Sequence, residues 1–423
     1  MALLSPEDPI DLSVFEPGFT RDPHSVYAEF RVGRPVNRVV VQGLQGWLVT
    51  RYDDVRQALS DPSLSNDRST ASPAARSAAW LFADEAFDLQ HHMLRSDPPR
   101  HTRIRRLVSP VFALRSVARL QSRIEQIAHE LVDRFAERGN AELISMYAFP
   151  LPLMIIMEIM GIPPADRERL YSWSNTLSAG SSSSGEDVVA ALTRMCDFFR
   201  DLLERKQDMA GQLEESESLL DILATALYQD GTLDEAELLS SAFQLLQGGH
   251  VTTLGLIANG MLALLQAPDA LAELRSDPGL MNTAVDELLR FDPPMEIATV
   301  RFTTSPTRIG DVTIPGGGEP VLLALASANR DPARFDHPDA LDLKRDSPGH
   351  LAFAHGAHYC LGAHLARLEA RIAFEVLIQR LDDLALAVDP EALEWRPNPH
   401  LRRPATLPVT FTVRDHDKEK QHG

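Results

Sequence analysis

Cysteine is almost absent from this sequence. Cys196 and Cys360 are the two that occur among 423 residues, which excludes a disulfide-stapled secreted fold and favours a reducing compartment. The N-terminal residues lack the basic and apolar regions of a secretory signal, and no stretch reaches the roughly 18 uninterrupted apolar residues of a membrane span. We therefore expect a cytoplasmic protein with no membrane association.

A dominant basic surface is also lacking. The formal net charge of -19 at pH 7 excludes general binding to nucleic acids or anionic membranes, because both need positive surfaces. One stretch differs: residues 98–124 contain no acidic side chain but include Arg100, Arg103, Arg105, Arg106, Arg115, Arg119 and Arg123. This basic run is either a solvated helix face or a docking patch for an anion or an acidic protein.

Low-complexity linkers are scarce. The serine-rich stretch at residues 178–187 is predicted to be a mobile loop within a single domain that spans residues 1–423. Helical periodicity dominates residues 117–289, and short strand-like runs lie nearer the ends, including a hairpin around residues 43–46. The pattern predicts a mainly α protein with small β-sheets, of the α+β class.

A long helix is predicted after residue 232. Thr232 and Glu235 have the spacing of a capping box, and apolar periodicity continues to Ala267, where Pro268 ends it. Such a helix is about 50 Å long, enough to cross the molecule.

The middle of this helix contains Gly248 and Gly249. Each costs on the order of 1 kcal/mol relative to alanine in a helix, so the pair indicates either close helix packing or a ligand that needs bare backbone. The Thr252 hydroxyl is expected to bond back to a carbonyl one turn earlier.

Cys360 lies in a glycine-flanked loop directly before an amphipathic helix. The positive end of the helix dipole and the unpaired amide groups there favour a thiolate over a thiol. Gly356 permits a turn, and Gly362 permits a flat ligand to approach the backbone. By itself, a cysteine in this position is more often a small buried hydrophobic residue, so its position alone does not establish a reactive thiolate.

The segment Phe353-x-x-Gly356-x-His358-x-Cys360-x-Gly362 matches the haem-binding signature of the cytochrome P450 family. Further segments that resemble motifs of soluble bacterial members occur in family order, at residues 97–105, 248–253, 287–290 and 329–338. The resemblance covers essentially the whole chain. It implies the P450 fold, a triangular-prism-like domain whose long central helix lies over the haem.

The resemblance implies haem b as the cofactor and Cys360 as the thiolate ligand of its iron. Phe353 is implied to shield the sulfur, and Gly362 to lie against the ring. Buried haem propionates need cations, and the residues at the matching positions are His101, Arg105, Arg301 and His358.

The resemblance implies oxygen activation beside Gly249 and Thr252, with Thr252 holding the water that passes protons. The family usually has an acid directly before this threonine, whereas this chain has Val251. Proton delivery is therefore expected through His250, ordered water or a substrate hydroxyl. The departure also keeps open a haem-thiolate enzyme of atypical chemistry: a peroxygenase, a C–C or C–O bond-forming enzyme, or one that rearranges its substrate.

Substrate contacts are predicted from helix spacing. Gln244, Gly248 and Thr252 form one row, with Gln247 beside it, which predicts a substrate with hydrogen-bonding groups because unpaired buried amides are costly. By family position, the pocket walls come from residues 80–94, 177–189 and 295–298, with Phe82, Phe87, Met93 and Ile297 as candidates.

A structural role is assigned to Glu287, Arg290 and Arg330, which resemble the family's charge-balanced Glu-Arg-Arg cluster. The resemblance further implies a monomer that takes electrons from NAD(P)H through ferredoxin reductase and ferredoxin. The basic run gains a role here, with Arg103, Arg106 and Arg115 as docking residues for an acidic ferredoxin.

The function predicted is therefore a haem-thiolate monooxygenase that inserts one oxygen atom from O2 into a small organic substrate, as a tailoring step in bacterial secondary-metabolite biosynthesis. A remote alternative is a non-haem metal protein. Its candidate ligands crowd the same loop and are His355, His358, Cys360 and His364.

Overall fold

The computed structural model describes residues 9–12, 18–78, 89–179, 185–209, 218–346, 349–396, 398 and 400–414. The candidate pocket residues Phe82 and Phe87 lie outside these ranges, as do residues 180–184 of the serine-rich stretch. The described residues are mainly helical, with small β-sheets, as the sequence predicts.

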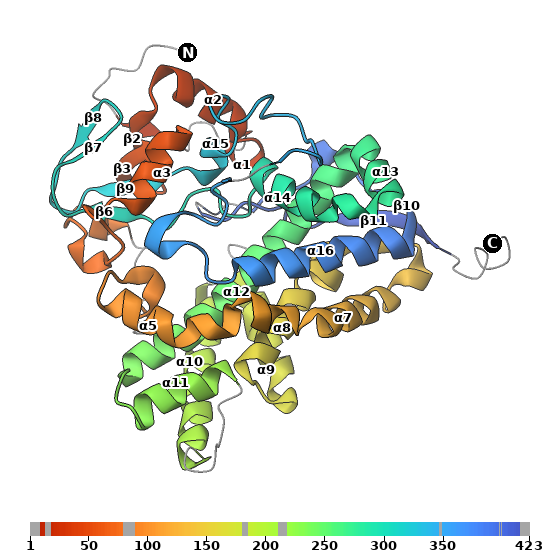
Figure 1. Ribbon diagram of the computed structural model, residues 1–423, viewed down its shortest axis with the longest axis horizontal. Coiled ribbons are helices and arrows are strands. Elements are labelled where there is room, and N and C mark those ends of the chain that lie inside the picture. Colours follow the sequence, from red (N-terminus) through yellow and green to blue (C-terminus); the bar gives the residue numbers. More distant parts are fainter. Residues whose placement is uncertain are drawn as a thin grey trace.

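The main sheet lies toward the upper left of the molecule, and most of the longer helices lie below it and to its right, on what we call the helical side (Figure 1). The helices nearer the N-terminus are α1 (Gly18–Arg21), α2 (His24–Gly33), α3 (Tyr52–Ser60), α5 (Arg100–Val108), α6 (Leu114–Ala118), α7 (Gln121–Asp133), α8 (Pro150–Met160) and α9 (Arg167–Ala179). Those that follow are α10 (Gly185–Met209), α11 (Leu219–Tyr228), α12 (Glu235–Gln266), α13 (Pro268–Ser276), α14 (Met281–Phe291), α15 (Leu325–Ala328) and α16 (Ala363–Arg380).

The main sheet has six strands in the order β1 (Ile10–Asp11), β2 (Val36–Val41), β3 (Leu44–Val49), β9 (Pro320–Leu323), β6 (Arg301–Thr303) and β4 (Leu64–Ser65). Smaller sheets join β10 (Leu381–Leu386) to β11 (Pro408–Val413) and β5 (Asn140–Glu142), and β7 (Thr307–Ile309) to β8 (Val312–Ile314). The predicted hairpin is β2–β3, but its turn lies at Gln42 and Gly43. Gly46 pairs with Val39 inside the ladder, so the predicted turn was placed too far along the chain.

Helix α12 is the central element, and it runs through the middle of the helical side (Figure 1). The predicted cap was wrong. The side chain of Asp234 accepts from the Glu237 backbone N–H, and the side chain of Glu237 accepts from the Asp234 backbone N–H. Both pairs have the capping-box spacing, and the stronger acceptor is used. The helix has 32 residues, or about 48 Å at 1.5 Å per residue.

By length and composition alone, α12 is also the one helix in the described ranges that could cross a membrane. Its most apolar window is 72% buried within the protein, however. Helices α8, α10, α11, α14 and α16 pack around it, and this packing explains the apolar sequence. The helix belongs to the largest hydrophobic core, so it can hold side chains rigidly on the face that is left open.

Candidate active site

A largely apolar cavity separates α12 from the loop that contains Cys360. About 1370 Å³ of empty space lies within it, part of which is open to solvent. The wall from α12 includes Gln244, Gly248, Gly249, Thr252 and Thr253, and the opposite wall includes Phe353, His358, Cys360, Gly362 and Glu369. The rim between them includes Met93, His101, Arg105, Met295, Ala298, Thr299 and Arg301. The structure therefore brings together segments that are far apart in the sequence.

The Cys360 loop is held by its own backbone. The Cys360 N–H donates to the Phe353 carbonyl at 2.9 Å, and Gly356 adopts the positive φ of 75° that its predicted turn requires. A Cβ added at Gly362 would meet no atom within 4 Å, so the backbone there borders open space. Burial raises the pKa of the Cys360 thiol, and the Gly362 N–H and the charges of Arg105 and Arg367 offset this only in part. The loop by itself therefore does not favour the thiolate as predicted, because burial outweighs the nearby donors and charges. Coordination to a cation would complete the deprotonation.

Gly248 and Gly249 lie on the stretch of α12 that faces this loop. Close helix packing and exposure of backbone to the cavity, the two roles predicted for the pair, both occur there. A Cβ on Gly249 would lie 2.6 Å from an Ile156 side-chain carbon, so Gly249 allows α8 to pack closely. A Cβ on Gly248 would lie 3.1 Å from the Gln244 side-chain nitrogen, so Gly248 leaves room for that amide, and both glycines border the cavity. The Thr252 hydroxyl donates to the Gly248 carbonyl at 3.1 Å, as predicted.

Four side chains, which we call the cavity cations, line one side of the cavity: His101, Arg105, Arg301 and His358. They come from α5, β6 and the cysteine loop. The His101 and His358 rings lie 4.3 Å apart. Arg105 donates to the Tyr359 carbonyl at 2.7 Å. Both ring nitrogens of His101 and the Arg301 Nε are buried and have no hydrogen-bond partner within the described ranges.

The cavity cations repel one another. Burial, followed by the charges of Arg301, His101 and Arg105, lowers the pKa of His358 to about 3. Burial lowers the pKa of Arg301 to about 10, against the attraction of Asp97. The Asp97 carboxylate in turn accepts from the Ser65 hydroxyl and the Asn66 N–H. The lowered pKa values of the two histidines leave Arg105 and Arg301 as the charged members of this group. Buried nitrogens without partners beside charged guanidinium groups are what a bound anionic group would satisfy.

Glu369 is a cavity residue that the sequence analysis did not identify. It lies on α16, is fully buried, and has no hydrogen bond of standard geometry to either carboxyl oxygen among the described residues. Burial raises its pKa well above the ordinary range, and the nearby Thr253 hydroxyl offsets this only in part. Burial therefore favours the neutral, protonated form of this carboxyl group. A signal was present, because Glu369 shares a helix face with Leu365 and Ile372.

Three predicted residues do not reach the cavity. His250 is fully buried, bonds through Nδ1 to the Leu246 carbonyl at 2.7 Å, and faces the ring of Phe149. Gln247 lies on another face of α12, with its Nε2 3.9 Å from the Met195 sulfur. The direct proton route through His250 and the substrate contact of Gln247 are therefore wrong, because neither side chain lines the cavity.

Ile297 is the third misplaced residue. It is buried in a separate core with Tyr27 and Leu322, while its neighbours Met295 and Ala298 face the cavity. Gln244, by contrast, lines the cavity as predicted, and its Oε1 is buried with no partner in the described parts of the chain.

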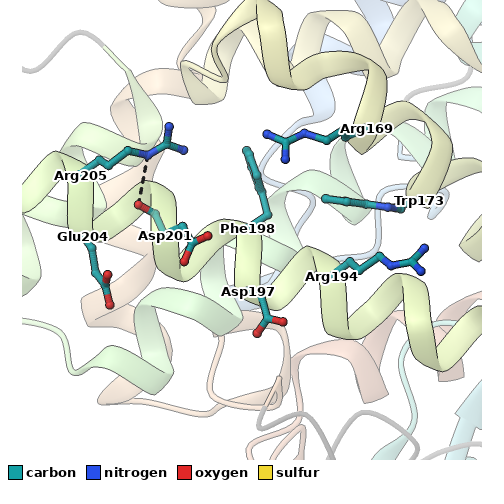
Figure 2. Close-up of a pocket in the computed structure, with 8 residues that line it drawn as sticks. All are labelled: Arg169, Trp173, Arg194, Asp197, Phe198, Asp201, Glu204 and Arg205. Carbon is teal, nitrogen blue, oxygen red and sulfur yellow. Dashed lines mark hydrogen bonds between the residues drawn. The ribbon is translucent and has the colours of Figure 1, made fainter.

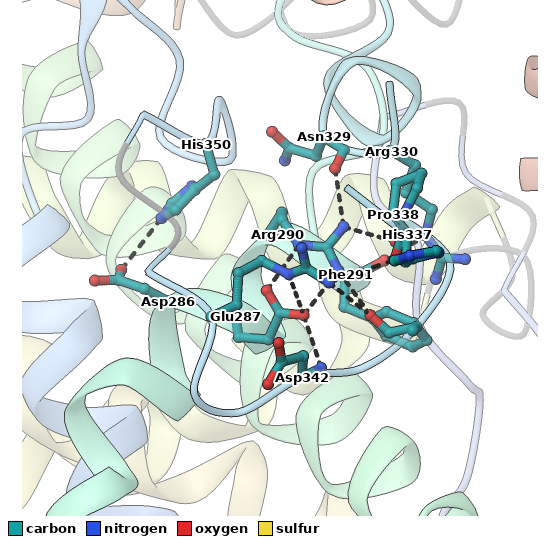
Figure 3. Close-up of polar contacts among 12 residues, drawn as sticks. Asp286, Glu287, Arg290, Phe291, Asn329, Arg330, His337, Pro338, Asp342 and His350 are labelled. Atoms are coloured by element: carbon teal, nitrogen blue, oxygen red, sulfur yellow. Dashed lines mark hydrogen bonds and ion pairs between the residues drawn. The ribbon is translucent and has the colours of Figure 1, made fainter. Parts of the chain in front are cut away.

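The predicted three-residue charge cluster exists with one different member. Figure 3 shows Glu287 and Arg290 facing each other. Glu287 accepts from Arg290 Nε at 2.7 Å and from Arg345 Nε at 3.2 Å. Arg330 instead donates to the Phe291 carbonyl at 2.8 Å and pairs with Asp339. The assignment of Arg330 was wrong, because the chain after Arg330 turns back and places Arg345 beside the carboxylate. We call Glu287, Arg290 and Arg345 the α14 cluster.

The non-haem metal alternative finds no support in the part of the chain that the structure describes. No group of three or more His, Cys, Asp or Glu side chains there is arranged to hold a metal ion. The His358 ring lies 4.3 Å from the His101 ring at an angle of 45°, and neither His355 nor His364 lines the cysteine cavity.

The basic run is divided by ion pairs. Glu237, at the start of α12, pairs with Arg103 at 2.8 Å and with Arg100 at 3.2 Å. Arg123 pairs with Glu158. The ion pair of Arg103 with Glu237 thus joins α5 to α12. Arg106, Arg115 and Arg119 are exposed.

A second hollow lies on the surface between α9 and α10 (Figure 2). Trp173 and Phe198 form its aromatic floor, with the Arg169 guanidinium 5.8 Å from the Phe198 ring. Arg205 Nε donates to the Asp201 backbone carbonyl at 3.2 Å. The hollow shares no lining residue with the cysteine cavity, so it plays no direct part in the chemistry of that cavity.

Comparison with known proteins shows which family has this fold. The family model described as cytochrome P450 matches residues 165–394. The chain belongs to the cytochrome P450 family, which confirms the predicted family, fold and enzyme class. The family binds haem iron.

Individual relatives match over nearly the full length. Cytochrome P450 107B1 of Saccharopolyspora erythraea is 43% identical over 403 residues, covering 94% of this chain and 97% of that protein. The cytochrome P450 monooxygenase PikC of Streptomyces venezuelae is 42% identical over 407 residues, covering 95% and 94%. The solved structure of tirandamycin C-bound P450 monooxygenase TamI superposes with a TM-score of 0.84 at 41% identity, covering 96% and 100%. Monooxygenases of bacterial secondary-metabolite biosynthesis are among the matched relatives.

Proposed function

We propose that this protein is a haem-thiolate monooxygenase in which Cys360 is the iron ligand. The observation that carries the proposal is the cavity itself: one cysteine faces Thr252 across a space bordered by cations that lack anionic partners. Haem b, when bound, supplies the iron at which O2 is activated for insertion of one oxygen atom into an organic substrate.

The residues present fit this cofactor. The orphaned donors of His101 and Arg301 match the need of two buried propionates, with Arg105 and His358 beside them. Phe353 covers the cysteine loop, and the open space at Gly362 suits a flat ring. Gly249 and Thr252 line the opposite wall, where the reacting molecules would lie.

We place proton supply on α16 in addition to α12. Val251 cannot carry a proton, and His250 faces away from the cavity. Glu369 lies on the cavity wall beside Thr253, and its raised pKa favours the protonated carboxyl group. Thr253 directly follows Thr252 in the chain. The Glu369 carboxyl holds the proton, and Thr252 positions the water that carries it.

The substrate proposed is a bacterial secondary metabolite with at least one hydrogen-bond donor, modified in a tailoring step. Gln244 supports this, because its unpartnered Oε1 lies at the cavity and would accept from such a donor. A solved relative of 41% identity is bound to tirandamycin C, which supports an organic substrate in this cavity. Met93, Met295 and similar side chains supply the apolar contacts.

Electrons are proposed to come from NAD(P)H through ferredoxin reductase and an acidic ferredoxin, in the cytoplasm. The docking surface is narrower than the basic run and comprises Arg106, Arg115 and Arg119, with Leu114, which is 65% exposed. Charge reversal at Arg106 or Arg115 should slow ferredoxin-dependent turnover and reduce its salt dependence. The matched control is R308E, at an exposed arginine on β7. Equal effects of R308E and the docking variants would contradict this surface.

A second candidate is a haem-thiolate enzyme that uses peroxide, forms a bond between two groups, or rearranges its substrate. Val251 favours it, because the usual acid is missing from α12. Product formation without reductant and O2, supported by peroxide alone, would favour this candidate. A strict requirement for both reductant and O2, with one oxygen atom gained, would favour the monooxygenase.

The test of the proposal is the absorbance of the reduced, carbon-monoxide-treated protein. A thiolate-ligated haem gives a strongly red-shifted band, which C360H should lose while binding haem through the imidazole. C196A is the matched control and should keep the band, because Cys196 is buried outside the cavity. A properly folded wild-type protein without the band would overturn the assignment of Cys360.

A further inference from the structure

We infer that Arg367 is a positioning residue that sets how strongly the Cys360 sulfur donates electrons. It acts through the positive charge of its own guanidinium group, which lies against the Phe353 ring. The inference rests on the proposed function, because it presumes that Cys360 is the iron ligand. It concerns the side of the cysteine loop that faces α14 and α16, away from the substrate.

The first observation is the stacking of Arg367 on the cysteine loop. Its guanidinium carbon lies 4.5 Å from the centroid of the Phe353 ring. The Phe353 carbonyl accepts the Cys360 N–H at 2.9 Å, so the ring and the cysteine are held together by backbone. A planar guanidinium over an aromatic face is a favourable and well-defined arrangement. The cation is thereby kept at a fixed place beside the loop.

The second observation is the anchor that fixes Arg367. Asp286 of α14 accepts from Arg367 Nε at 2.7 Å and lies 3.2 Å from His350 Nε2. The side chains of Asp286 and His350 point toward each other in Figure 3. His350 Nδ1 accepts the Ala352 N–H at 3.2 Å, next to Phe353. One carboxylate therefore ties α14, α16 and the cysteine loop together.

The charges have opposite consequences at the sulfur. The positive charge of Arg367 stabilises an electron-rich thiolate and also favours the added electron when the iron is reduced. The negative charge of Asp286 cancels part of that effect. The side chains are 32% and 36% exposed, so solvent screens both charges. Removal of Arg367 should make reduction harder, and neutralisation of Asp286 should make it easier.

Opposite signs distinguish this role from a structural one. A merely structural contact would give R367Q and D286N the same kind of defect, namely lower stability with little change in reduction. Arg371 offers a matched control. It lies one turn further along α16, is similarly buried, and pairs with Glu375 at 3.1 Å.

The experiment is a redox titration of the haem-loaded full-length protein at one pH, with unfolding temperatures measured in parallel. R367Q should lower the equilibrium constant for one-electron reduction by up to about tenfold, equivalent to about 59 mV. D286N should raise it by a smaller factor, and R371Q should leave it unchanged. The reduced carbon-monoxide band of R367Q should shift further to the red, because the sulfur donates more strongly.

Two variants keep the test decisive if R367Q loses haem. R367K keeps the charge without the flat stacking and should fall between wild type and R367Q, and D286N still tests the opposite sign. Shifts of R367Q and D286N in the same direction, or an R367Q value equal to that of R371Q, would overturn the inference. Failure of the proposed function is separate, because the wild-type protein would then lack the red-shifted band from the start.

Discussion

Two groups of buried charge in this protein have opposite environments. In the α14 cluster, Glu287 and Arg290 are fully buried and bonded to each other. Arg290 also donates to the Asn329, Pro338 and Ala340 carbonyls. The cavity cations have orphaned donors at His101 and Arg301 and no carboxylate of their own among the described side chains that bond to them.

The difference separates structure from binding. A buried charge completed by its own chain holds segments together and leaves nothing for a ligand. A buried charge left incomplete costs free energy in the empty protein, and a ligand of opposite sign recovers it. By this criterion we assign the α14 cluster to the fold, and we propose that the cavity cations, Gln244 and Glu369 serve binding and chemistry.

The largest effect is expected at the α14 cluster. E287Q leaves the buried Arg290 uncompensated and should cost about 3–5 kcal/mol of unfolding free energy, enough to prevent haem incorporation. The measurement is denaturant unfolding together with haem content. E375Q, at a half-buried pair on α16, is the control and should cost less than about 1 kcal/mol. A stable, haem-loaded E287Q would show that the two groups do not differ as claimed.

At the cavity cations, by contrast with the α14 cluster, a substitution is expected to weaken haem binding without lowering the stability of the haem-free protein. R301Q removes a charge that the empty protein does not pair, so the haem-free form should be as stable as wild type or more so. The loaded form should lose haem roughly 10- to 150-fold faster, for the loss of roughly 1.5–3 kcal/mol of charged hydrogen bonding. Haem transfer to a scavenger protein and unfolding of the haem-free form measure the two effects. Destabilisation of the haem-free form would instead place Arg301 with the α14 cluster.

A catalytic effect with little effect on binding is expected at Glu369. E369Q keeps the shape of the side chain but holds no transferable proton, so product formed per NAD(P)H consumed should fall several-fold. E375Q is the control on the same helix. If E369Q formed as much product per NAD(P)H consumed as the wild type, proton supply would be assigned to water alone.

Stability of the haem-free protein gives a second measure for Glu369. Its pKa is raised in the folded state, so its contribution is present below the ordinary glutamate pKa and is lost as pH rises through the folded value. The wild type should therefore lose stability relative to E369Q as pH increases. A constant difference across pH would indicate that the carboxyl is not the buried proton carrier.

The smallest effect is expected at Gln244. Q244L should weaken substrate binding by roughly 1 kcal/mol, about fivefold, because one hydrogen bond is lost. Substrate-induced change in haem spin state measures the affinity. Q247L is the matched control, since Gln247 lies outside the cavity. Unchanged affinity in Q244L would remove the argument for a hydrogen-bonding substrate.

The sequence by itself determined the local features of this site. The turn at Gly356, the position of Cys360 before α16 and the hydroxyl bond of Thr252 all form within a few residues, so backbone geometry and residue type are sufficient to predict them. The family resemblance added His101, Arg301 and His358, which the structure does bring to one cavity.

Only the tertiary structure decided which distant groups meet. Arg330 and Arg345 both follow Glu287 in the chain, and the path of the intervening loop places Arg345 at the carboxylate. The packing of α12 turned His250 and Gln247 away from the cavity, and the approach of α16 brought Glu369 to it. Such contacts depend on how whole elements pack, and periodicity within one helix does not specify its rotation or its neighbours.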